Sequence, residues 1–157
     1  MSNKLIFVYI FVAVFPLLFI ALALGIGSLV GFASGWYSLQ SRYPDQPGEP
    51  LLRLRFQSGM MGRARTNLRN VLTLSACQTG LRVGMWRLMG PFCRDFFVPW
   101  QEISVERSPT LFGQGARLTF GSPAVGSLFL SSAVANQLAR AAGENWPEKG
   151  QPAGQPA

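Results

Sequence analysis

Arginine is the ionisable residue that this sequence concentrates in one stretch. The chain carries 14 Lys and Arg against 7 Asp and Glu, and residues 53–94 contain eight arginines and no acidic residue. They are Arg53, Arg55, Arg63, Arg65, Arg69, Arg82, Arg87 and Arg94. Such a block binds anionic lipid headgroups or nucleic acid, or it only sets the topology of a membrane segment. Few aromatic residues alternate with these arginines for base stacking, so nucleic acid is the less favoured partner.

The sequence offers no recognisable catalytic or metal-binding set. It has no histidine, which removes the Ser-His-Asp and Cys-His arrangements. Its two cysteines, Cys77 and Cys93, are too few for a zinc site, and we expect free thiols in or near the core. We interpret Asp95, which follows Arg94, as half of an exposed ion pair. No phosphate-binding glycine motif is present. We therefore expect no enzyme activity, no metal and no cofactor.

One long apolar segment precedes the basic region. No residue between Lys4 and Arg42 is charged. As a helix, Leu5–Ala33 would extend about 43 Å, more than the ~30 Å hydrocarbon core of a bilayer. The alternative is a cleaved signal peptide, whose apolar core is normally shorter than this run. We predict that residues 1–40 form an uncleaved, single-pass transmembrane anchor.

The flanks of this segment predict its orientation. Positive charge is denser after the segment than before it, which favours a plasma-membrane protein with its C-terminal domain in the cytoplasm. Trp36 and Tyr37 directly follow the segment. Aromatic residues at this position are typical of the interfacial belt of a membrane helix, so we expect both side chains at the membrane surface.

Small residues recur at every fourth position along the segment, at Ala23, Gly27, Gly31 and Gly35. This spacing places them on one helix face, where two membrane helices could approach closely. We predict a possible homo-oligomer through Gly27, Gly31 and Gly35. The alternative is that glycine is simply common in membrane helices.

The remainder predicts one small, mainly-β domain at residues 51–143, after a proline-rich linker at 41–50 and before a disordered tail at 144–157. Leu51–Ser58 alternates Leu and Phe with Arg and Gln, which predicts a half-buried strand with Phe56 inward. A turn is expected at SGMMG, residues 58–62. Further strands are expected at residues 70–75, 81–85, 96–100, 103–107, 117–120 and 127–130.

The last expected element is a helix that starts at Ser131 or Ser132 and ends at Gly143. The connections between strands are too short for parallel crossovers, so the sheet should be antiparallel. Pro99 restricts its strand to an edge or a bulge, and Trp100 should be a core residue. The predicted fold is an N-terminal transmembrane helix plus a bent antiparallel sheet closed by a C-terminal helix.

Three segments resemble a group of small bacterial membrane proteins in which one transmembrane helix precedes a PH-like or GRAM-like β-domain. They are FQSGMMG, LTLSACQTGLRV and FFVPWQEISVER. The resemblance covers about residues 51–142. It implies a PH-like domain and carries no catalytic residues. Residues 85–95 (MWRLMGPFCRD) depart from the pattern of the group.

Two functional hypotheses follow. In the first, the protein is a membrane-tethered, non-catalytic binding module. Arg63, Arg65 and Arg69 then face anionic lipid headgroups or a membrane protein partner. In the second, it is a structural or assembly protein that oligomerises through its transmembrane helix.

Overall fold

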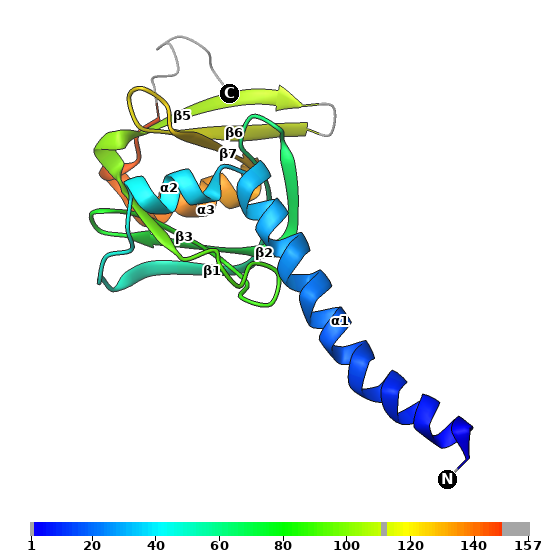
Figure 1. Ribbon diagram of the computed structural model, residues 1–157. Helices are drawn as coiled ribbons and strands as arrows, with labels where there is room; N and C mark the ends of the chain where they lie inside the picture. The colour runs from blue at the N-terminus through cyan, green and yellow to red at the C-terminus, as the bar shows by residue number, and fades with distance from the viewer. Residues whose placement is uncertain (1, 111–112, 149–157) are drawn as a thin grey trace.

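The computed structural model describes residues 2–110 and 113–148, and Figure 1 shows a long helix projecting from a β-domain. The helix, α1 (Asn3–Ala33), has 31 residues and contains Pro16. Its large apolar side chains are exposed over most of its length. Within the described residues it is the one helix long and apolar enough to cross a membrane, which agrees with the predicted segment.

Seven antiparallel strands form one curled sheet in the order β4-β3-β2-β1-β7-β6-β5. Their bounds are β1 Pro50–Met61, β2 Thr66–Cys77, β3 Gly80–Met85, β4 Phe96–Pro99, β5 Ile103–Thr110, β6 Gly113–Phe120 and β7 Gly126–Ser131. The end of β1, Gly59–Met61, pairs with both β2 and β7 and so joins the two halves of the sheet. The C-terminal helix α3 (Ser132–Ala142) packs on both halves. The predicted bent antiparallel sheet with a C-terminal helix is therefore confirmed.

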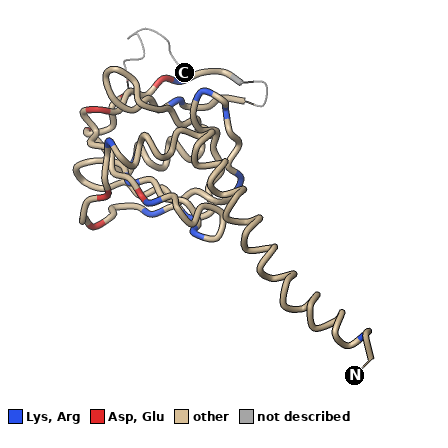
Figure 2. The backbone as a smooth tube through the Cα atoms, viewed as in Figure 1, with Lys and Arg blue, Asp and Glu red and all other residues tan. Residues whose placement is uncertain are grey.

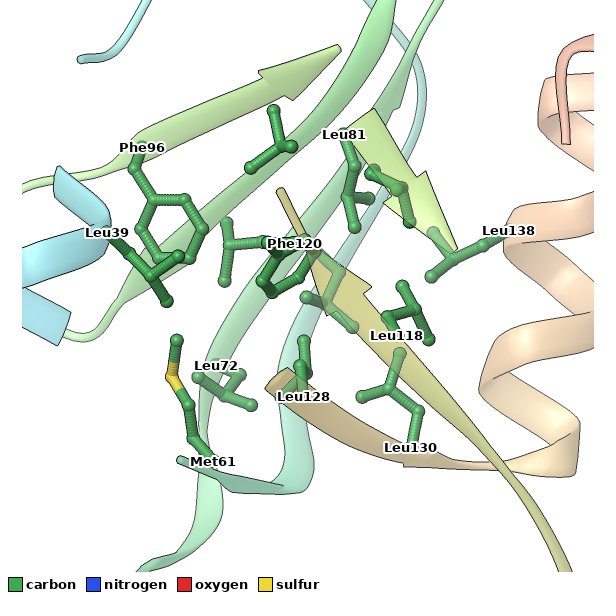
Figure 3. Close-up of a cluster of buried hydrophobic side chains, with 14 of the residues drawn as sticks. Leu39, Met61, Leu72, Leu81, Phe96, Leu118, Phe120, Leu128, Leu130 and Leu138 are labelled. Atoms are coloured by element: carbon green, nitrogen blue, oxygen red, sulfur yellow. The ribbon is translucent and has the colours of Figure 1, made fainter. Parts of the chain in front are cut away.

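The hydrophobic core lies between the two halves of the sheet. Figure 3 shows side chains from both halves converging there, with Leu138 entering from α3 and Leu39 from the short helix α2 (Trp36–Arg42). Phe96 packs edge-on against Phe120, with 5.9 Å between ring centroids. Trp100, in the 3-10 turn Trp100–Glu102 that connects β4 to β5, is buried as predicted. β4 is an edge strand, which is where Pro99 is tolerated.

The predicted boundary between anchor and domain is wrong at α2. Trp36, Leu39 and Tyr43 are buried in the core, whereas Trp36 was expected at a membrane surface. These residues follow an i, i+3, i+7 spacing, which gives a short helix one apolar face. Gly35, with a φ of +74°, provides the left-handed turn that directs α2 away from the axis of α1. The folded domain therefore begins at residue 36 rather than 51.

Strand β1 also differs from its predicted pattern. Its register shifts between Leu54 and Gln57, and Phe56 has a φ of +55°. This irregularity reverses the alternation, so the Phe56 side chain is exposed rather than inward. The expected turn at residues 58–62 is instead strand as far as Met61, and the reversal occurs at residues 62–65.

The first part of the predicted disordered tail is ordered. Trp146 packs against Trp100 with 5.9 Å between ring centroids, and the Val105 backbone N–H donates to the Pro147 carbonyl (3.3 Å). Glu148 forms an ion pair with Arg107 at 3.1 Å. Residues 144–148 therefore cover part of the β5 edge. The rest of the predicted tail, residues 149–157, lies outside the described residues.

Candidate functional site

The arginines predicted to bind lipid lie on the β1–β2 hairpin. Arg63 and Arg65 are at its turn, Arg69 is on β2, and all three are exposed. The turn packs against the junction of α1 and α2, because a Cβ on Gly62 would lie 2.6 Å from the Ser34 carbonyl oxygen. The structure thus places these three arginines on one hairpin beside the C-terminal end of α1.

A second segment lies beside α1, and it is the β3–β4 loop, residues 86–95. A Cβ on Gly27 would lie 2.9 Å from the Met89 carbonyl oxygen and 2.9 Å from Pro91 Cδ. A Cβ on Gly31 would lie 3.0 Å from Cys93 Sγ. The two glycines thus allow the loop to pack directly on the backbone of α1.

The glycine face of α1 is therefore occupied within one chain. Gly27 and Gly31 are buried by the β3–β4 loop and by Tyr37. Gly35 lies beyond the end of α1, so its predicted place on the helix face is wrong. Association of two chains through Gly27 and Gly31 remains a prediction, and it would require the loop to move away.

Helix α2 fixes the base of the same loop. The Trp36 indole Nε1–H donates to the Arg94 carbonyl (2.8 Å), and the Arg94 backbone N–H donates to Gln40 Oε1 (2.9 Å). Cys93, between these contacts and α1, is buried, and burial raises the pKa of its thiol. The loop is consequently held by both helices, which places its side chains in a defined position relative to α1.

An open groove of about 800 Å³ is lined by the β3–β4 loop and by the end of α2. Arg87 and Arg94 line it from the loop, and Gln40 and Ser41 line it from α2. Among the described residues neither arginine forms an ion pair, whereas Arg82 is paired with Asp45 at 2.7 Å. Asp45 and Asp95 line the same groove, so its charged lining is two arginines and two aspartates. Asp45 is already paired with Arg82, and the guanidinium groups of Arg87 and Arg94 are the groups that could bind an anionic ligand such as a phosphate group.

Asp95 also lines this groove, and its predicted exposed pairing with Arg94 is wrong. The carboxylate is half-buried beside β3, where a Cβ on Gly84 would lie 2.7 Å from Asp95 Oδ1. It forms no ion pair within the part of the chain that the structure describes. Burial raises the pKa of Asp95, the charge of Asp45 raises it further, and nearby arginines including Arg87 oppose the shift.

The tip of the β3–β4 loop exposes large apolar side chains. The exposed fractions are 46% for Trp86, 65% for Leu88, 50% for Met89 and 53% for Phe92. Phe56, which the irregularity in β1 turns outward, packs edge-on against Trp86 with 6.5 Å between ring centroids. The sequence interpretation missed this cluster. Its signal was the run of apolar residues in MWRLMGPF, a segment with turn residues and without strand periodicity.

Charge is distributed unevenly around these features. Figure 2 shows Asp and Glu mainly on the side of the domain away from α1, and Lys and Arg also on the strands and loops next to α1. After Lys4 the projecting part of α1 carries no charged residue. The surface around the C-terminal part of α1 thus combines cationic groups with exposed apolar side chains.

Both cysteines are free and buried, as predicted, and burial raises the pKa of Cys77 as it does that of Cys93. Across residues 2–110 and 113–148, no cluster of three or more Cys, Asp or Glu side chains could hold a metal ion. No protein-family model, no curated protein and no solved structure matches this chain.

Proposed function

We propose that this chain is a single-pass plasma-membrane protein whose β-domain is a non-catalytic module that binds anionic lipid headgroups. Its domain would lie on the cytoplasmic side. The length and apolar surface of α1 support the span. We further propose that the domain is PH-like. Strands β1–β4 form one meander and strands β5–β7 form a second, and the two are joined where β1 pairs with β7. This arrangement, followed by a C-terminal helix, supports that assignment.

The observation that carries this proposal is the packing of the β3–β4 loop on Gly27. Between Leu5 and Gly27 the helix rises about 33 Å, close to the ~30 Å thickness of the hydrocarbon core. A span that begins at Leu5 therefore leaves the bilayer at the level of this loop. The groove that contains Arg87 and Arg94 would then lie at the level of the headgroups.

The same measure places the hairpin arginines farther from the membrane. The hairpin turn packs on Ser34, seven residues beyond Gly27, which corresponds to roughly 10 Å along a helix axis. This exceeds the screening length of about 8 Å at physiological salt. We therefore assign headgroup binding first to Arg87, which lies two residues before Met89 in the part of the loop that packs on Gly27. Arg94 lines the same groove and is assigned with it. Arg63, Arg65 and Arg69 remain candidates for contact with a membrane protein partner.

Lipid retention by the intact protein tests this proposal. Native mass spectrometry of the detergent-solubilised chain, titrated with phosphatidylglycerol or phosphatidylcholine, should show preferential retention of the anionic lipid. Each cation next to an anionic surface contributes about 1 kcal/mol, so Arg87→Gln with Arg94→Gln should weaken that retention roughly 30-fold.

Two further variants serve as comparisons in this titration. Arg140→Gln, at an exposed position on α3, should leave retention unchanged. Replacement of Arg63, Arg65 and Arg69 with Gln should have a smaller effect than the groove pair. Equal retention of both lipids by the wild-type protein would contradict the proposed ligand. A larger loss of retention in the hairpin variant than in the groove variant would indicate that the headgroup site is on the hairpin.

A further inference from the structure

We propose that the tip of the β3–β4 loop is a second membrane anchor, inserted beside α1 into the headgroup region and the adjoining acyl chains. The inference rests on the proposed membrane span, because the level of the bilayer surface is taken from α1. It concerns the apolar side chains of the loop and is separate from headgroup binding by the groove.

The position of the loop is the first support. Met89 and Pro91 pack on Gly27, and Cys93 packs near Gly31, so the loop lies along the last turns of α1. Figure 1 shows the connection between β3 and β4 beside α1, on the side of the domain from which the helix projects. The loop thus adjoins the apolar surface of α1.

The loop side chains are the second support. Trp86, Leu88, Met89 and Phe92 are each close to half exposed or more, although they are large and apolar. Exposed apolar clusters of this kind mark sites of contact with a partner or a membrane. Because the cluster adjoins a helix whose own side chains are apolar and exposed, lipid is the occupant that covers both surfaces at once.

Part of the backbone of the loop is paired internally. The Met89 N–H donates to the Trp86 carbonyl (2.9 Å), and the Cys93 N–H donates to the Gly90 carbonyl (3.0 Å). These two turns provide internal partners for some of the backbone groups that would otherwise need water. The remaining N–H groups of the loop can bind water or phosphate oxygens at the level of the headgroups. Trp86 is followed by Arg87, and this combination is typical of an interface, where the ring enters the headgroup region and the guanidinium reaches phosphate.

Tryptophan fluorescence can test the insertion directly. Trp86 is the exposed one of the four tryptophans, because Trp36 and Trp100 are buried and Trp146 is half-buried. The intact protein is placed in phosphatidylcholine nanodiscs whose acyl chains are brominated near the headgroup. Subtracting the spectrum of the Trp86→Phe variant isolates the Trp86 signal. That signal should be quenched by the brominated lipid and should be shielded from aqueous iodide.

A variant with charged residues in the loop provides the second arm of the fluorescence test. Leu88→Asp combined with Phe92→Asp should expose Trp86 to iodide and remove most of the quenching by brominated lipid. Leu51→Asp is the matched control, since Leu51 is also exposed but lies at the start of β1, and it should change neither measurement.

The outcomes separate the inference from the proposed function. If the wild-type protein resists extraction by alkaline carbonate but Trp86 is quenched by iodide and not by brominated lipid, the insertion is overturned. Selective retention of phosphatidylglycerol can still hold in that case. Release of the protein by carbonate would overturn the membrane span and the insertion together.

Discussion

Replacing Gly27 with alanine should separate two roles for the glycine face of α1. In the structure, the new Cβ would lie 2.9 Å from the Met89 carbonyl oxygen and 2.9 Å from Pro91 Cδ. A backbone carbonyl in a loop held by two helices cannot yield as easily as the end of a flexible side chain. The β3–β4 loop should therefore be displaced from α1.

Gly25→Ala is a matched control for this change. Gly25 lies on the same helix, two residues away, and a Cβ there meets nothing within 4 Å. Both variants gain about 1 kcal/mol from the higher helix propensity of alanine, so this gain cancels when the two are compared. The remaining difference is the cost of overpacking, which is typically about 1–3 kcal/mol.

The assay combines two measurements on the intact protein in detergent or nanodiscs. Thermal unfolding should show Gly27→Ala less stable than Gly25→Ala by about that amount. Hydrogen exchange should show faster exchange at the Met89 and Cys93 amides in Gly27→Ala alone, because these amides belong to the displaced loop.

Two results would refute this reasoning. Equal stability and equal loop exchange in the two variants would mean that the loop does not pack on Gly27. If Gly27→Ala instead abolished crosslinking between chains and left loop exchange unchanged, the glycine face would serve helix association, as the sequence pattern alone suggests.

Three further predictions concern the domain. Trp100→Phe removes the indole donor (3.1 Å) to the buried Cys77 carbonyl, so thermal unfolding should report a loss of about 1–3 kcal/mol; an unchanged melting temperature would contradict that role. Leu138→Ala should cost about 2–5 kcal/mol by leaving a cavity between α3 and the sheet, whereas the exposed Gln137→Ala should lie within about 0.5 kcal/mol of wild type. Burial raises the pKa of Asp95 in the folded state above its value in the unfolded state. At a pH between these two pKa values the folded state binds more protons, so the free energy of unfolding decreases as the pH rises through this range. Asp95→Asn should therefore raise the melting temperature at neutral pH and flatten its dependence on pH in the acid range, and a lower melting temperature at neutral pH would contradict the shift.

Sequence patterns with a local cause were sufficient for the main architecture. An uncharged apolar run predicts α1, short apolar runs bounded by turn residues predict the strands, and Gly143 predicts the end of α3. These features depend on the residues of each segment and their near neighbours. The same holds for the buried thiols and for Trp100, because apolar and half-apolar side chains between strands are normally enclosed by a sheet.

Tertiary packing determined several features of burial and order that local sequence patterns could not predict. Trp36 directly follows the apolar run, so its sequence position predicts a membrane interface, yet in the structure it is buried in the domain core together with Leu39. Phe56 is turned outward by an irregularity that depends on pairing with β2. Residues 144–148 have no periodicity, but β5 and Trp100 provide partners for them.

The candidate site depends most strongly on the tertiary structure. The sequence determined that arginines are abundant and that glycines recur along one face of α1. Only the fold determined that the β3–β4 loop covers Gly27 and Gly31. It also placed Arg87 and Arg94 in one groove with the end of α2, and Arg63 beside Phe32, Ala33 and Ser34 at the end of α1. The physical reason is that the sequence gives the order of the arginines but not their positions in space. Those positions are set by the packing of the sheet and of α2 against the end of α1.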